Sequence, residues 1–157
     1  MKVPEKGRRA KCAFQKAGQN AVIYGIGVDT ASAARLEKSM AREHFVCRVF
    51  GEKERALLQS RGPAHRAETA AANFAAKEAL AKALGTGLSG FVWVQAQALR
   101  AQSGAPYFSF SGQLAETMRQ KGITAHLSIT HEGGFATAFV VLEKTAQPVT
   151  HGMEDIG

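Results

Sequence analysis

The alternation of apolar and polar residues divides the chain into short strands and helices between residues 21 and 145. Five stretches have the alternation or composition of strands: residues 21–29, 91–100, 107–110, 123–131 and 135–143. Four stretches are predicted to be helices: residues 30–50, 52–60, 66–84 and 112–122. Because helices interleave with antiparallel strands, we predict an α+β fold for one domain over residues 21–145.

The first predicted strand, "AVIYGIGVD", has two unlike faces. One face is apolar, and the other carries Gly25 and Gly27 and leads to Asp29. Glycine on a strand face permits another backbone or helix to approach closely. The end of a strand often positions functional groups, so Asp29 is a candidate site residue.

The helix predicted over residues 66–84 is rich in alanine, the best helix former, and Gly85 is a natural stop for it. It carries Glu78 and Lys82 one turn apart, a spacing that ordinarily stabilises an exposed helix. If the glycine face of the first strand packs on this helix, Asp29 and Glu78 converge. Two hard oxygen ligands with room for water and phosphate suit Mg²⁺, and Lys82 could reach a phosphate on the same side.

Two other patterns are weaker evidence for a binding site. The sequence "GTGLSG" at residues 85–90 matches a dinucleotide-binding fingerprint, but here a helix precedes it and a strand follows, which is the wrong context. His126 and His131 lie five residues apart in one predicted strand and point to opposite faces, which is poor geometry for a shared zinc. From spacing alone, each is better explained as a surface or hydrogen-bonded core histidine.

The net charge of +7 over 157 residues is concentrated at the N-terminus. Residues 1–20 contain six Lys or Arg and one Glu, and we expect a disordered basic extension there and a loose tail over residues 146–157. A nucleic-acid-binding function would rest on this extension alone, so we expect no nucleic acid partner. Residues 35–66 carry eight basic and four acidic residues, which fits either an acidic partner or a solvated face.

Other features indicate a cytoplasmic protein. No apolar run approaches the ~18 residues of a membrane span, and the N-terminus lacks the pattern of a secretory signal. Cys12 and Cys47 are too few for a disulfide framework, which favours a reducing compartment. We therefore expect a cytoplasmic protein without a membrane partner.

Five blocks in order resemble the holo-[acyl-carrier-protein] synthase family, the small trimeric 4′-phosphopantetheinyl transferases. The blocks cover about residues 22–144: "IYGIGVD" with Arg35, "HFVCRVFGEKE" through Phe45, Arg48, Phe50 and Glu54, "FAAKEALAKALGTG", "GAPY" and "LSITHEGGFATAFVVLE". The resemblance implies an antiparallel sheet packed against a long helix, in a homotrimer with active sites between protomers. It also implies Mg²⁺ as cofactor, coenzyme A as substrate and a serine of apo acyl carrier protein as acceptor, with adenosine 3′,5′-bisphosphate leaving.

The resemblance also implies a role for individual residues. The matched residues are Asp29 and Glu78 as catalytic metal-binding acids, Lys82 as a catalytic phosphate contact, Gly85, Thr86 and Gly87 as the turn against coenzyme A, Ser128 and His131 as the S-x-x-H element that binds the nucleotide, and Arg35 as a carrier-protein contact. Arg35, Lys38 and Arg42 are further predicted to share one helical face.

One position departs from the family pattern. The arginine that usually precedes the F-A-x-K-E block is Asn73 here, with His65 and Arg66 upstream, so we expect a weaker or rearranged phosphate contact. A catalytically silent module that binds carrier protein or nucleotide on the same fold is the alternative function.

Overall fold

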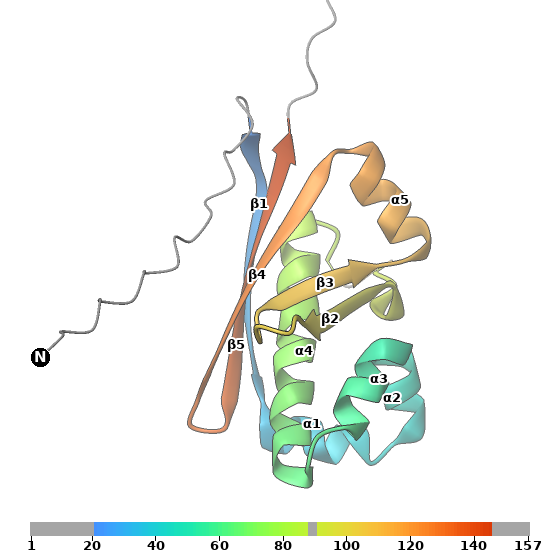
Figure 1. The fold of residues 1–157 in the computed structure, drawn as a ribbon, viewed down its shortest axis with the longest axis vertical. Coiled ribbons are helices and arrows are strands. Elements are labelled where there is room, and N and C mark those ends of the chain that lie inside the picture. Colours follow the sequence, from blue (N-terminus) through green and yellow to red (C-terminus); the bar gives the residue numbers. More distant parts are fainter. Residues whose placement is uncertain (1–20, 88–90, 146–157) are drawn as a thin grey trace, which may run out of the picture.

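The computed structural model describes residues 21–87 and 91–145, so the expected extension, the expected tail and the last three residues of "GTGLSG" lie outside the described residues. The elements in chain order are β1 (Ala21–Ser32), α1 (Ala33–Met40), α2 (Glu43–Val49), α3 (Glu52–Gln59), α4 (Pro63–Leu84), η1 (a 3₁₀ turn, Trp93–Gln95), β2 (Ala96–Arg100), β3 (Pro106–Phe110), α5 (Gly112–Gln120), β4 (Ile123–Glu132) and β5 (Phe135–Thr145) (Figure 1).

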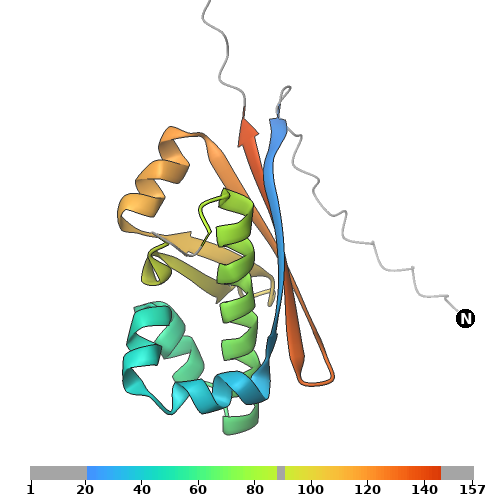
Figure 2. The ribbon, with the colours of Figure 1, turned by 180° about the vertical axis from the view of Figure 1, so that it is seen from behind.

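The strands form two antiparallel sheets, which confirms the predicted α+β class. One sheet has the order β1-β5-β4, and the other is the pair β2-β3. A turn through Gly133 and Gly134, both with positive φ, joins β4 to β5. The long helix α4 packs against one face of the three-stranded sheet, while α1, α2 and α3 gather around one end of α4 (Figure 2).

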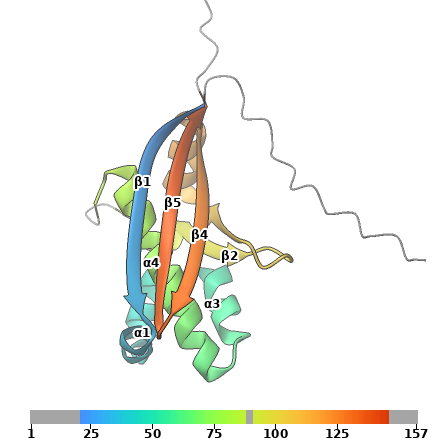
Figure 3. The ribbon, with the colours of Figure 1, turned by 90° about the vertical axis from the view of Figure 1, so that its left-hand side faces the viewer.

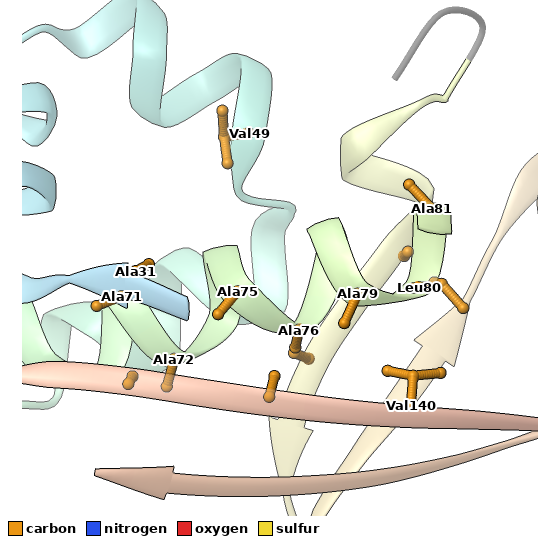
Figure 4. Packing of buried hydrophobic residues seen from close by; sticks show 14 of the residues in the cluster. Ala31, Val49, Ala71, Ala72, Ala75, Ala76, Ala79, Leu80, Ala81 and Val140 are labelled. Carbon is orange, nitrogen blue, oxygen red and sulfur yellow. The ribbon is translucent and has the colours of Figure 1, made fainter. Parts of the chain in front are cut away.

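The contact between β1 and α4 depends on residues without bulky side chains. A Cβ added at Gly25 would lie 2.0 Å from the carbonyl oxygen of Ala83, and one at Gly27 would lie 2.0 Å from that of Ala79. α4 buries a row of alanines, several of which are labelled in Figure 4. Backbone therefore packs directly against backbone, and this holds the end of β1 close to the second half of α4.

We expect Gly27→Ala to lower the free energy of unfolding by about 3 kcal/mol or more, at the upper end for overpacked cores, because the obstructing atom belongs to the backbone of α4. Chemical denaturation would measure the loss. Gly62→Ala is the matched control, since an added Cβ there meets nothing within 4 Å. Equal stability of the two variants would contradict the close packing described here.

Some predicted boundaries are wrong. The single helix expected over residues 30–50 is two helices, because β1 continues to Ser32, which caps α1, and because Arg42 has extended backbone angles before α2. Arg42 therefore does not continue the helical face of Arg35 and Lys38. The strand expected over residues 91–100 is a strand only from Ala96 onward.

The face of the three-stranded sheet that points away from α4 is apolar and exposed. Among the described residues no helix or strand covers it, as Figure 3 shows from that side. Ile26 and Val28 of β1 are 60% and 53% exposed, and Phe139 of the central strand is 46% exposed. Such a large unpaired apolar surface on a folded chain is typical of an interface.

Candidate active site

One cavity brings together four of the residues singled out in the sequence. It has a volume of about 430 Å³ and lies between the end of β1, α1 and the second half of α4. Its lining includes Asp29, Arg35, Glu78 and Lys82. The cavity therefore combines two carboxylates with two cations, a set of groups suited to a polyanionic ligand and a metal ion.

Local structure explains how each side chain reaches the cavity. Asp29 follows the two glycines on the α4 side of β1, and Glu78 and Lys82 lie one turn apart on α4. Arg35 lies in the first turn of α1, where its N–H donates to the Oγ of Ser32 at 3.4 Å. The close backbone packing of β1 on α4 thus brings an acid from each element into one site.

Lys82 neutralises Asp29 in this structure. Its Nζ lies 2.7 Å from Oδ1 of Asp29 and also donates to the carbonyl oxygen of Val28 at 2.9 Å. The Lys82 side chain is 53% exposed, so water screens the pair and its contribution to stability is small. The ammonium is therefore close to the acids and remains accessible from the cavity.

Glu78 has an unusual electrostatic environment. Partial burial raises the pKa of its carboxyl above the usual range, and the negative charge of Asp29 raises it further. Lys82 and Arg35 act in the opposite direction without cancelling the rise. A carboxyl with a raised pKa is a better proton acceptor when ionised. A bound cation would reduce the repulsion between Glu78 and Asp29.

The acids fit a magnesium ion better than a transition metal. Within the described residues no group of three or more His, Cys, Asp or Glu side chains is placed to hold a metal. Mg²⁺ is commonly held by one or two carboxylates together with water and phosphate oxygens. Asp29 and Glu78 meet that requirement as a pair.

A second cavity, of about 510 Å³, shares Glu78, Phe45 and Phe74 with the first. Its walls include Phe45, Phe74 and Trp93, and the rings of Phe74 and Trp93 are stacked with centroids 5.4 Å apart. Basic residues Arg42, His44 and Arg48 also line it. Glu78 thus lies between a charged cavity and an aromatic one.

Ser128 and His131, the S-x-x-H residues, lie elsewhere in the structure. His131 lines a separate cavity of about 220 Å³ with Glu68 and the β4–β5 turn. Ser128 is exposed on the outer face of the sheet, opposite Phe139. His126 pairs with Glu143 at 3.2 Å, and alternation along β4 places it and His131 on opposite faces, as predicted. Within this chain, neither His131 nor Ser128 lines the cavity that contains Asp29 and Glu78.

The glycine turn follows the C-terminus of α4. Gly85 ends the helix with φ 71°, and Gly87 has φ 59°. Thr86 lines another cavity with Tyr24 and Phe91. None of these residues lines the cavity of Asp29. Gly85 lies seven positions after Glu78, about 10 Å along the helix axis.

Asn73 is part of the core and does not line the cavity of Asp29, so the weaker or rearranged phosphate contact stays a prediction. Asn73 is fully buried, and its Nδ2 donates to Glu54 at 3.2 Å and to the carbonyl oxygen of Ala98 at 2.8 Å. Arg100 donates to its Oδ1 at 3.2 Å.

Sequence reasoning also missed a buried ion pair between Glu54 and Lys77. The signal for it was a lysine in the middle of an alanine-rich helix. Its partner lies 23 positions earlier and cannot be identified from the sequence pattern.

The chain is similar to known proteins in both sequence and structure. The family model described as the 4′-phosphopantetheinyl transferase superfamily matches residues 25–140. A holo-[acyl-carrier-protein] synthase of Herminiimonas arsenicoxydans is 42% identical over 133 residues, which cover 78% of this chain and 99% of the relative. The synthase of Myxococcus xanthus is 44% identical over 124 residues, covering 77% and 95% of the two chains.

Solved structures show the same similarity. A holo-(acyl-carrier-protein) synthase from Bacillus anthracis in complex with CoA (3′,5′-ADP) aligns with a TM-score of 0.67 and 33% identity, covering 78% of this chain and 98% of that one. The synthase from Neisseria meningitidis aligns with a TM-score of 0.69 and 34% identity, covering 78% and 100%.

Proposed function

This chain belongs to the 4′-phosphopantetheinyl transferase superfamily, and from that premise we propose that it is a holo-[acyl-carrier-protein] synthase. It transfers the 4′-phosphopantetheine arm of coenzyme A to a serine of apo acyl carrier protein. The products are holo acyl carrier protein and adenosine 3′,5′-bisphosphate. The observation that carries this proposal is the cavity that joins Asp29, Glu78 and Lys82 in a chain about two-fifths identical to named synthases.

The reaction needs a proton acceptor and a countercharge for the diphosphate. The serine oxygen attacks the β-phosphorus of coenzyme A, and the bond from that phosphorus to the bridging oxygen of the diphosphate breaks. We assign the serine proton to Glu78, directly or through a water, because its carboxyl has a raised pKa and borders both cavities. Lys82 binds the phosphate oxygens, where its charge opposes the negative charge that develops.

Magnesium is part of the proposal. Asp29 and Glu78 would hold it, since they are the two carboxylates that line the cavity beside Lys82 and Arg35. When bound, Mg²⁺ neutralises charge on the diphosphate and helps to align the displacement.

We also propose that the active enzyme is a homotrimer. Two features support this assembly: the exposed apolar face of the sheet, with Ile26, Val28 and Phe139, and the separation of His131 from the acids within one protomer. Contact between protomers would bury the apolar face. It would also allow His131 and the Gly85–Gly87 turn to act on a nucleotide held by a neighbour.

Arg35 is proposed to dock the acidic carrier protein. Arg35 lies at the start of α1 and lines the cavity of Asp29 and Glu78, and Lys38 follows one turn later. We expect Arg35→Glu to raise the KM for carrier protein about tenfold or more, with a smaller effect on the KM for coenzyme A, because charge complementarity governs encounter and partner choice. Steady-state kinetics with each substrate varied in turn would measure both constants.

Lys53→Glu is the control for this experiment, since it reverses an exposed charge on α3, away from the cavity. Its KM for carrier protein should remain that of the wild type, and added salt should weaken the wild type in the same direction as Arg35→Glu. An unchanged carrier KM in Arg35→Glu would remove Arg35 from the docking surface.

One assay separates the enzyme from a silent binding module. Apo carrier protein is incubated with the protein, coenzyme A and Mg²⁺, and its mass is measured. An increase by one phosphopantetheine group supports the transferase, whereas binding without any mass increase supports the silent module.

We propose the cytoplasm as the site of the reaction, on the basis of the exposed free thiol of Cys47. The described helices include none that could span a membrane. We propose coenzyme A and carrier protein as the partners of the described domain, and we propose no nucleic acid or membrane partner.

A further inference from the structure

The most deeply buried charges in the described chain belong to Lys77 and Glu54, and the proposed reaction uses neither. Both side chains are fully buried and form an ion pair. Burial lowers the pKa of Lys77 and raises that of Glu54, while their mutual attraction acts in the opposite direction on each. Taking two charges out of water is costly, so the pair needs a reason for its presence.

Glu54 is held by backbone and side-chain donors. Its carboxylate accepts from the N–H of Gly51 at 2.9 Å, from the N–H of Ala98 at 3.0 Å and from Asn73. It therefore has a fixed position between α3, α4 and β2. Lys77 is in turn held by Glu54.

The ammonium of Lys77 reaches the backbone of two wall segments. Its Nζ donates to the carbonyl oxygen of Val49, at the end of α2, and to that of Trp93 in η1 at 2.9 Å. Val49 and Trp93 both line the aromatic cavity, and so does Glu78, the residue next to Lys77 on α4. One buried ammonium thus connects two walls of this cavity to the helix that carries Glu78.

Stability alone is a weak explanation for the pair. Buried ion pairs are often replaced by apolar residues of similar volume with little loss of stability, although removal of one partner is strongly destabilising. An apolar replacement would, however, leave the carbonyl groups of Val49 and Trp93 without their donor. Such a replacement would therefore change the position of the Val49 and Trp93 segments in the wall of the aromatic cavity.

We propose that Lys77 is a positioning residue for the transfer reaction: held by Glu54, it binds the carbonyl groups of Val49 and Trp93 and so fixes the aromatic wall relative to Glu78. The effect on turnover rests on the proposed function, whereas the placement of the wall does not. The charged cavity with Asp29 and Lys82 is not lined by Val49 or Trp93. Phe45 and Phe74 line both cavities, but the charged groups of the first cavity, Asp29, Arg35 and Lys82, do not line the aromatic one. The KM for coenzyme A should therefore change little.

The double variant Glu54→Gln/Lys77→Met tests this role. It removes both buried charges at similar side-chain volume, so a folded protein is expected. We expect kcat to fall about ten- to a hundredfold, as small misplacements of reacting groups do, with a KM for coenzyme A close to that of the wild type. Trp93 is the only tryptophan in the chain, so its emission maximum and its quenching by acrylamide report the wall directly.

Two further variants separate positioning from stability. Glu54→Gln/Lys77→Gln retains an amide donor for the carbonyl groups and should recover part of both kcat and the wild-type emission. Leu58→Ala removes a buried side chain that lines neither of the two cavities beside Glu78. It should therefore lower the melting temperature without moving the aromatic wall. Its kcat, measured well below its melting temperature, should remain that of the wild type.

Each possible result of these experiments either supports or overturns the positioning role of Lys77. Wild-type kcat and emission in the folded Glu54→Gln/Lys77→Met protein would overturn the proposal, as would an equal fall of kcat in Leu58→Ala. If the methionine variant does not fold, the glutamine variant is compared with Leu58→Ala, and equal kcat and emission in those two would overturn it. If the wild type transfers no phosphopantetheine, the proposed function fails, but the emission of the variants still tests the placement of the wall.

Discussion

Asp29→Asn and Glu78→Gln are each expected to lower phosphopantetheine transfer by about two to three orders of magnitude and to leave the protein folded. Each substitution retains the size of the side chain and removes one of the two negative charges proposed to hold Mg²⁺. Glu78→Gln also removes the proposed proton acceptor. Initial rates over a range of Mg²⁺ concentrations, with mass analysis of the carrier protein, would measure the effect.

Stability should not account for these losses. Glu78 is repelled by Asp29, so removal of either charge relieves that repulsion. The ion pair that Asp29→Asn removes involves a half-exposed Lys82, and such pairs contribute about 1 kcal/mol or less. Glu116→Gln on α5 serves as the control carboxylate, with unchanged rate. Near-normal transfer by either site variant at saturating Mg²⁺ would contradict the assignment of the two acids.

Phe139→Glu is expected to dissociate the proposed trimer and to reduce activity by about a hundredfold or more. Phe139 lies at the middle of the central strand on the exposed face, so a charge there is tolerated by one protomer but costs several kcal/mol when an interface buries it unpaired. Because the site residues are divided among protomers in the proposed assembly, loss of the trimer removes groups from each active site. Analytical ultracentrifugation and initial rates at the same protein concentration would test both effects.

Tyr107→Glu on β3 is the matched control, since Tyr107 is 44% exposed on the other sheet. This variant should keep the mass and the rate of the wild type. A wild-type protein that sediments as a fully active monomer, or a Phe139→Glu protein with unchanged mass, would exclude the sheet face as the interface.

The sequence was most informative about features that depend on neighbouring residues, such as strand alternation and the end of a helix. Alternation in residues 21–29 placed Gly25, Gly27 and Asp29 on one face of a strand, and the alanine-rich helix ended at Leu84 with Gly85 after it, as the structure has it. Small residues on both elements indicated that they could approach closely. Hence the convergence of Asp29 and Glu78 could be predicted as a consequence of packing.

The features that the sequence did not predict depend on long-range contacts. The break between α1 and α2 occurs without Gly or Pro, and the partners of Lys77 come from three separate elements. The burial of Asn73 likewise depends on Glu54 and Ala98, which are distant in the sequence. Neither hydrophobic spacing nor helix propensity contains this information.

The ion pair between Lys82 and Asp29 implies an exchange of partners during the proposed reaction. A divalent ion held by Asp29 would compete with the ammonium and release it, and the released ammonium would be free to bind the diphosphate. By thermodynamic reciprocity, metal and diphosphate would then increase each other's affinity by the same factor. One lysine would thus make the loading of the site cooperative, so that neither ligand binds as well alone as the two bind together.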